Sequence, residues 1–228
     1  MQNPKVLVAC EESQRVCTAF RDRGIEAYSC DIQGPSGGHP EWHICGDVIP
    51  VLGGGTVTTM DGREHNIGKW DLIIAHPPCT KTSNAGAKHL FRGHKLNLQR
   101  YFDGMCGKAF FMTIWNAPCE RMAVENPTPS AIFEFPKPTQ TIEPFYFGHP
   151  VRKKTHLWMR GLPLLEPTNI VDPTENCHEA GTWFMVGGKE RQRNRSKTFP
   201  GIAQSFAKQW GDYLLNIERE ENTDGPDL

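Results

Sequence analysis

Residues 71–86 read Asp-Leu-Ile-Ile-Ala-His-Pro-Pro-Cys-Thr-Lys-Thr-Ser-Asn-Ala-Gly, and this stretch carries the clearest structural signal in the chain. Its apolar run at residues 72–75 is typical of a strand that is buried on both faces of a parallel sheet. Pro77 and Pro78 cannot continue a central strand, so the chain must turn there. Cys79 therefore follows the carboxyl end of a strand, where open α/β sheets bind their ligands. We predict that Cys79 is a nucleophile, and a half-buried structural cysteine is the alternative.

Segments of strand and helix character alternate along the rest of the sequence. Strands are predicted at residues 5–9, 25–30, 42–48, 71–75, 120–124 and 155–159, helices at 11–23, 99–116 and 202–217, and a hairpin within 53–69. Strands separated by helical lengths predict an α/β fold in which helices cover both faces of a mostly parallel sheet. We expect one domain, built from residues 1–159 and 196–228, with residues 160–195 as a short irregular insert.

The composition is that of an ordinary globular protein, with 38% hydrophobic residues and a mean hydropathy of −0.51. No stretch approaches the roughly 20 apolar residues of a membrane span, and the first residues lack the apolar core of a signal peptide. The eight cysteines form no Cys-x-x-Cys pair, which favours reduced thiols in the cytoplasm. We expect no contact with a membrane. We also expect no metal site, because Cys177-His178 has no second pair at ligand spacing.

The formal net charge of −1 does not by itself indicate a nucleic-acid partner. The basic residues are clustered, however. Residues 189–197 hold five Lys or Arg against one acid, and residues 152–154 hold three more. Both clusters are suited to contacts with phosphate, and solvated surface loops are the alternative.

Acidic residues follow several of the predicted strands. Asp31 comes directly after the second strand, Asp47 lies near the end of the third, and Glu125 follows the strand at 120–124. An acid after the second strand of a βαβ unit commonly binds a ribose hydroxyl of a nucleoside-containing cofactor. Because parallel strands end at one edge of a sheet, we expect these carboxylates and Cys79 to share that edge.

Six segments resemble, in the same order, motifs of the DNA cytosine-5 methyltransferase family, and the layout is similar to that of its small phage and prophage members. The segments are Asp31, Gly46-Asp47-Val48, residues 78–86, Glu125-Asn126-Pro127, residues 147–155 and residues 199–202. The resemblance implies a Rossmann-like sheet that binds S-adenosyl-L-methionine as cofactor, and cytosine-containing DNA as the partner. It also implies the cytoplasm of a bacterium or of a phage-infected host cell.

The resemblance implies three catalytic residues. Cys79 would add as a thiolate to C6 of cytosine and so make C5 nucleophilic enough to take a methyl group. Glu125 would protonate or hydrogen-bond N3 as charge develops there. Lys153 would lie near O2, at the position where the family usually carries Arg. A duplex substrate would have to release the target base from the helix.

The resemblance also implies binding residues. Those assigned to the cofactor are Ala9, Glu11, Glu12, Asp31, Ile32, Asp47, His76, Pro77 and Gly201. Those assigned to the substrate are Ser83, Asn84, Asn126, Arg193 and Arg195.

Two departures from the family pattern affect the expected activity. The glycine-rich first loop is replaced by residues 9–13, Ala-Cys-Glu-Glu-Ser, in which Glu11 or Glu12 would hold the ammonium group of the cofactor. The insert at 160–195 is far shorter than the family's target-recognition domain, and base readout needs several side chains in a groove. We therefore expect a short or relaxed recognition sequence, or dependence on an oligomer or a host partner.

Three other functions remain open. A cysteine beside proline that attacks C6 also fits methylation or hydroxymethylation of a free pyrimidine nucleotide, with residues 189–197 binding its phosphate. An amino-group methyltransferase is the second, although residues 76–79 lack the polar acceptor and the stacking aromatic of that motif. The third is a catalytically idle protein that binds nucleic acid through a methyltransferase-like fold.

Overall fold

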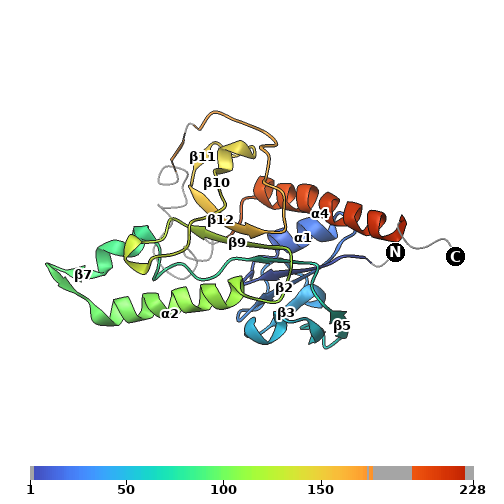
Figure 1. Cartoon of the computed structure of the whole chain (residues 1–228), viewed down its shortest axis with the longest axis horizontal. Helices are drawn as coiled ribbons and strands as arrows, with labels where there is room; N and C mark the ends of the chain where they lie inside the picture. The colour runs from blue at the N-terminus through green and yellow to red at the C-terminus, as the bar shows by residue number, and fades with distance from the viewer. Residues whose placement is uncertain (1–2, 174, 177–196, 224–228) are drawn as a thin grey trace.

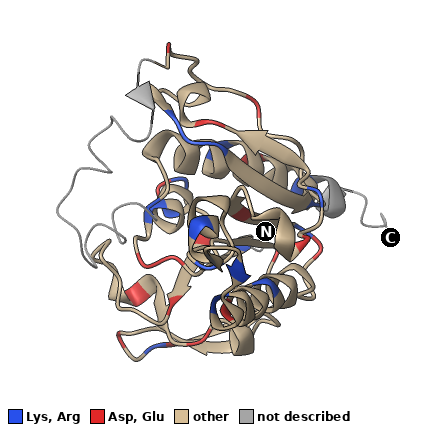
Figure 2. Ribbon diagram, turned by 90° about the vertical axis from the view of Figure 1, so that its left-hand side faces the viewer, with Lys and Arg blue, Asp and Glu red and all other residues tan. Residues whose placement is uncertain are grey.

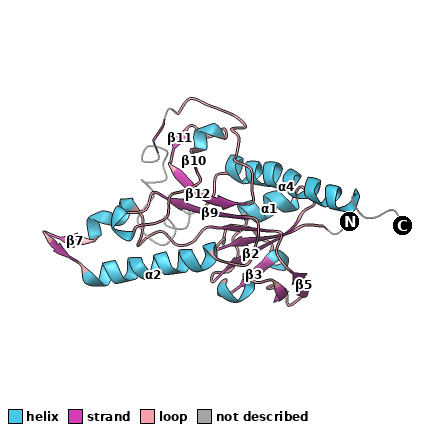
Figure 3. Cartoon of the chain, in the orientation of Figure 1, coloured by secondary structure: helices cyan, strands magenta, loops and turns pink. Residues whose placement is uncertain are grey.

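The computed structural model describes residues 3–173, 175–176 and 197–223. At its centre lies a seven-stranded sheet with the strand order β10-β12-β9-β6-β1-β2-β3 (Figure 1, Figure 3). The strands are β1 (Lys5–Ala9), β2 (Glu26–Asp31), β3 (His43–Cys45), β6 (Leu72–Ala75), β9 (Met122–Pro127), β10 (Gln140–Ile142) and β12 (Thr155–Arg160). The predicted α/β class is confirmed.

Five neighbouring strands of the sheet, from β3 to β9, run parallel. Strand β12 runs antiparallel to both β9 and β10. Numbered along the chain, the five parallel strands have the order 3-2-1-4-5, which is the order of a doubly wound sheet. In such sheets ligands bind beyond the carboxyl ends of the strands, at the point where the order reverses. Here that point lies between β1 and β6.

Helices cover both faces of the sheet (Figure 1). One face packs against α1 (Arg15–Arg21) and α4 (Pro200–Thr223), and the other packs against α2 (Leu98–Trp115). Successive strand residues point to opposite faces, so Val8 of β1 lies in the first apolar core and Leu7 lies in the second. The sheet is therefore buried on both sides, as its apolar strands predict.

The predicted hairpin within residues 53–69 is present. Its strands are β4 (Gly55–Thr58) and β5 (Glu64–Gly68). Val57 and Ile67 extend the second core, so the hairpin covers part of the same face as α2.

The first helix begins later than predicted. The sequence predicts a helix over residues 11–23, but α1 begins at Arg15. Cys10 and Gln14 have positive φ angles of 59° and 56°, so the chain between them is not helical. The Glu11 side chain instead accepts the free N–H groups of the first turn. The predicted helix start is therefore wrong.

Strand β9 is longer than the predicted strand at 120–124. It continues through Pro127 because the antiparallel strand β12 pairs with its outer side, where Glu125 lies opposite Leu157. On its inner side, pairing with β6 stops at Val124. The predicted strand is therefore present and ends in Glu125-Asn126-Pro127, and Glu125 is held inside the strand, close to its end.

Short elements complete the described fold. The hairpin of β7 (Phe91–Arg92) and β8 (Lys95–Leu96) precedes α2, and β11 (Val151–Arg152) pairs with β13 (Glu175–Asn176). Short 3-10 helices lie at Pro40–Trp42, Ile49–Val51, Asn84–His89, Ala131–Phe133 and Pro144–Tyr146. Within the described ranges, no helix combines the length and the apolar character that crossing a membrane requires.

Candidate functional site

The carboxyl edge of the parallel strands gathers most of the residues that the sequence singles out. Main-chain hydrogen bonds join the loops at this edge. The N–H of Glu11 donates to the carbonyl oxygen of Cys30 at 3.1 Å, and the N–H of His76 donates to that of Ala9 at 2.9 Å. The segments that leave β1, β2 and β6 are therefore fixed relative to one another where the strand order reverses.

Glu11 is buried at the start of α1. Its Oε1 accepts the N–H of Val16 at 2.7 Å, and its Oε2 accepts the N–H of Cys17 at 3.1 Å. Burial raises the pKa of Glu11, while the nearby His76 and the two N–H groups act in the opposite direction. Glu12 is buried as well. That either carboxylate binds the ammonium group of a cofactor stays a prediction.

Asp31 and Asp47 lie at the ends of neighbouring strands. The N–H of Gly46 donates to the carbonyl oxygen of Asp31 at 2.9 Å, which brings the turn that carries Asp47 beside the end of β2. Ile32 follows Asp31 and is 77% exposed. Burial and then the charge of Asp31 raise the pKa of Cys10, so this neighbouring cysteine stays protonated at neutral pH.

His76 and Glu125 form a buried polar pair. Nδ1 of His76 lies 3.1 Å from Oε2 of Glu125, and the side chains are 8% and 22% exposed. Burial alone would lower the pKa of His76, but the hydrogen bond and charge of Glu125 outweigh it and raise this pKa. Burial alone would raise the pKa of Glu125, but the contact with His76 lowers it. Both shifts favour an imidazolium beside a carboxylate. The sequence does not predict this pairing.

Cys79 lies at the end of β6 on a tightly turned loop. Its carbonyl oxygen accepts the N–H of Thr82 at 3.1 Å and that of Ser83 at 2.8 Å. Pro77 is buried and Pro78 is exposed, and the Cys79 side chain is half-buried. The turn and the two prolines together restrict where the sulfur can lie.

The loop that follows Cys79 is tied to the loop that follows β9. The N–H of Asn84 donates to the carbonyl oxygen of Thr128 at 2.8 Å, and the N–H of Ser130 donates to that of Thr82 at 2.8 Å. The segment at residues 78–86 is thereby joined through its main chain to the loop that follows Glu125-Asn126-Pro127, although the two are distant in the sequence.

The predicted substrate-binding residues are only partly described. Ser83 and Asn126 are buried and Asn84 is exposed. Arg193 and Arg195 lie outside the described residues, as does nearly all of the basic cluster at 189–197. Among the residues that the structure describes, no three His, Cys, Asp or Glu side chains could jointly hold a metal ion.

Lys153 reaches the same edge from the amino end of β12, because this strand runs opposite to its neighbour β9. Burial alone would raise the pKa of Glu125. The contact with His76 lowers this pKa, and the charge of Lys153 lowers it further. Nζ of Lys153 lies 5.6 Å from the centre of the Phe199 ring. Lys153 thus places a cation on the side of Glu125 that faces away from β6.

Gly201 lies in the first turn of α4. Its N–H donates to Nε2 of His149 at 3.0 Å, and a side chain here would collide with the carbonyl oxygen of Phe147. Nη1 of Arg15 donates to the carbonyl oxygen of Thr198 at 2.7 Å. The start of α4 is therefore fixed both to the loop before β11 and to the start of α1.

A basic projection next to Cys79 is not predicted from the sequence. Residues 81–100, here called the basic arm, contain no Asp or Glu and five cationic residues: Lys81, Lys88, Arg92, Lys95 and Arg100. The arm runs through the hairpin β7–β8, which stands out at the left of Figure 1, into α2. Figure 2 faces this end of the molecule. The absence of acids over the whole segment is a sequence signal that could have found it.

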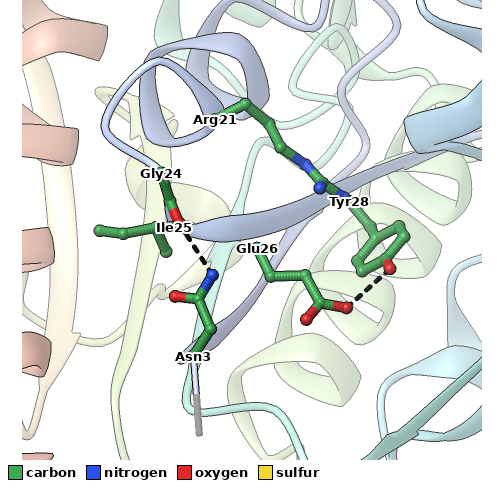
Figure 4. A pocket seen from close by; sticks show the side chains of 6 residues that line it. All are labelled: Asn3, Arg21, Gly24, Ile25, Glu26 and Tyr28. Carbon is green, nitrogen blue, oxygen red and sulfur yellow. Dashed lines mark hydrogen bonds between the residues drawn. The ribbon is translucent and has the colours of Figure 1, made fainter. Parts of the chain in front are cut away.

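A pocket of about 290 Å³ lies at the opposite edge of the sheet, beside the amino ends of β1 and β2 (Figure 4). It is lined by Asn3, Arg21, Gly24, Ile25, Glu26 and Tyr28. Nδ2 of Asn3 donates to the carbonyl oxygen of Gly24 at 2.8 Å, and the Tyr28 hydroxyl donates to Glu26 at 2.7 Å. Because these polar groups already bond to one another, we assign the pocket no function.

No protein family model matches the sequence, and no curated protein matches it. The carboxyl edge is accordingly interpreted from its own geometry and chemistry. It holds a half-buried thiol, a histidine–glutamate pair, a lysine and two strand-end aspartates, and it borders on the basic arm.

Proposed function

We propose that the chain is an S-adenosyl-L-methionine-dependent methyltransferase that acts on C5 of cytosine in DNA through a covalent adduct at Cys79. The main observation behind this proposal is the pair of main-chain hydrogen bonds between the Cys79 loop and the loop that follows Glu125. A thiol and a carboxylate that act on one pyrimidine ring must keep a fixed spacing. The sequence order of the resembling segments, which ends in Gly201 packed at the same edge, adds support.

The residues at the switch point of the sheet fit the cofactor. The Asp31 carboxylate suits a ribose hydroxyl, and the exposed side chain of Ile32 beside it suits the face of an adenine ring. His76 has a buried Nε2 that finds no hydrogen-bond partner among the described residues, so this edge is incomplete without a ligand. When bound, the cofactor supplies an electrophilic methyl group.

The site residues divide the remaining work. The Cys79 sulfur forms a bond to C6, and the electron density released by this addition moves to N3 and to C5. Glu125 delivers the proton that N3 takes up, and the cation of Lys153 offsets charge at O2. After C5 has gained the methyl group, water takes up the C5 proton and the electron pair of that C–H bond forms the double bond between C5 and C6. The sulfur then leaves C6 as a thiolate and the ring is restored.

The basic arm favours DNA over a free nucleotide as the substrate. A nucleoside monophosphate carries one phosphate, whereas a strand of DNA presents a row of phosphates that several cations contact at once. Lys88 and Lys95 are exposed on the arm, and Phe91 at its tip is 50% exposed. An exposed aromatic ring beside cations suits stacking on a base.

The test is covalent trapping on a random-sequence duplex that contains 5-fluorocytosine. Fluorine at C5 cannot leave as a proton, so the adduct persists after transfer of the methyl group. We expect a complex that survives denaturation and requires the cofactor, with Cys79 as the modified residue. Cys79→Ser should abolish the complex, and Cys106→Ser should not, because Cys106 is exposed on α2.

Three outcomes would overturn the proposal in different ways. An adduct with 5-fluoro-dCMP but not with DNA would select the free-nucleotide enzyme. Methylation of an exocyclic amine without an adduct would select the amino-group enzyme. Cofactor binding without any transfer, in wild type and Cys79→Ser alike, would select the idle nucleic-acid-binding protein.

A further inference from the structure

His76 lies between two carboxylates at the centre of the proposed site. Its Nδ1 is 3.1 Å from Oε2 of Glu125, and the charge of Glu11 acts on it from the segment after β1. The His76 side chain is 92% buried, since 8% of it is exposed. A buried histidine flanked by acids favours its protonated form, in which both ring nitrogens donate.

The second ring nitrogen of His76 has no partner. Nε2 is buried and makes no hydrogen bond among the described residues. Leaving a buried polar group unpaired costs about 1–3 kcal/mol, so such a group marks a place that a ligand completes. No structural role is visible for the ring beyond its contact with Glu125. The histidine therefore belongs to the reacting site and not to the supporting core.

We propose that His76 stores the proton that Glu125 delivers to N3 of the target base, an inference that rests on the proposed function. In the resting pair Nδ1 of His76 carries the proton and Glu125 is a carboxylate. When Cys79 adds to C6, the proton moves from Nδ1 to the carboxyl group and from there to N3. Glu125 has the same charge before and after this step, and His76 becomes neutral. The proton returns when the bond between sulfur and C6 breaks.

The groups that face the pair support the resting position of the proton on His76. Glu11 and Glu125 raise the pKa of His76 against the effect of its burial, and Lys153 opposes them weakly. His156 of β12 contributes to the lowered pKa of Glu125. Because the pKa of His76 is raised, the pair keeps its proton to a higher pH than an ordinary histidine would, and it loses this proton as the pH rises through that value. Turnover should fall over the same pH range.

The first test needs no turnover. Nitrogen-15 NMR of the histidine rings in the full chain, with His76 assigned from the spectrum of His76→Asn, reports which nitrogens carry protons at each pH. We expect His76 to titrate above an ordinary histidine in wild type and at a lower pH in Glu125→Gln, where Glu11 alone is left to oppose the effect of burial. A His76 that stays neutral throughout, or that titrates alike in both proteins, would overturn the inference.

The second test compares pH profiles of methyl transfer to duplex DNA. His76→Asn should lose about 10²-fold at pH values where His76 of wild type is protonated and Glu125 is ionised. The loss should shrink toward acid pH, where Glu125 itself takes up a proton, and also above the pKa of His76, where wild type lacks the stored proton as well. His76→Gln serves as a second variant, and thermal unfolding and cofactor affinity check that both variants fold. An equal loss at every pH, or no loss, would contradict the proton store.

His65→Asn is the matched control, because both ring nitrogens of His65 bond to hydroxyl groups, those of Tyr28 and Thr59, and this histidine lies on the β4–β5 hairpin away from Glu125. Its pH profile should follow wild type. If His76 titrates as expected and wild type transfers no methyl group to DNA, the proposed function fails and the proton-holding pair stands. If wild type transfers methyl groups and His76→Asn keeps the wild-type pH profile, the proposed function stands and the role of His76 as a proton store is contradicted.

Discussion

The N–H of Asn84 donates to the carbonyl oxygen of Thr128 at 2.8 Å and so links the loop that holds Cys79 to the end of the strand that holds Glu125. Asn84→Pro removes this donor with little other change, because proline is tolerated at the first position of a helical turn. The preceding Ser83 already has the extended backbone that proline requires, with φ −68° and ψ 148°.

We expect Asn84→Pro to form the 5-fluorocytosine adduct about 10- to 100-fold more slowly, because the reacting groups lose their alignment. Stability should fall by only about 1 kcal/mol. Asn84→Ala keeps the N–H group and removes the side chain that is predicted to bind substrate. Equal rates for the two variants would show that the main-chain link is unimportant.

Asp31→Ala should weaken binding of S-adenosyl-L-methionine. A hydrogen bond to a charged group contributes about 1.5–3 kcal/mol, and 1.4 kcal/mol is tenfold in affinity. The dissociation constant from calorimetry should therefore rise by about 10- to 100-fold. Asp22→Asn, at the exposed end of α1, should leave it unchanged. An unchanged affinity in Asp31→Ala would contradict the proposed role of Asp31 in binding the ribose of the cofactor.

Lys88→Ala together with Lys95→Ala should weaken DNA binding and reduce its salt dependence. Log affinity falls with log salt by about 0.9 for each phosphate contact. The slope of the double variant should therefore be shallower than that of wild type by about 2. Anisotropy titrations of a labelled duplex at several salt concentrations measure it. Lys208→Ala, exposed on α4, is the control. A wild-type slope in the double variant would exclude the arm as a DNA contact.

Arg160→Ala should destabilise the fold. The Arg160 guanidinium donates to the carbonyl oxygens of Trp115, Ala117 and Cys119, at the end of α2 and just after it, at 2.5, 2.5 and 3.0 Å. Losing these bonds should cost about 3 kcal/mol and lower Tm by about 6–12 °C in a chain of this size. Arg63→Ala removes an exposed ion pair and should lower Tm by about 4 °C or less. Similar Tm values for the two variants would contradict the prediction.

Much of the fold could be predicted from local sequence patterns. The run at 72–75 is buried as a parallel strand, and Asn97 caps α2 close to the predicted start, with its side chain accepting the N–H of Arg100. The first helix start could not be predicted, because the positive φ of Gln14 and the cap by Glu11 depend on tertiary contacts.

The site could be predicted in outline only. Strand-end positions of Asp31 and Cys79 follow from the order of elements, since parallel strands share an edge. The pairing of His76 with Glu125 has no local signal, because it depends on β6 and β9 being neighbours in the sheet. It also depends on β12, whose pairing carries β9 past the end of β6.

The path of the chain around β13 and the start of α4 has an evolutionary and practical consequence. Strand β13 pairs with β11 next to Lys153, and Thr198 is held by Arg15, so the chain leaves the described fold and re-enters it at the same edge. Because both anchoring contacts lie within the described residues, we expect length added between Asn176 and Lys197 to leave the described strands and helices in place. Under the proposed function, a recognition module grafted there would meet the DNA beside the target base, and this junction is where we would engineer sequence selectivity.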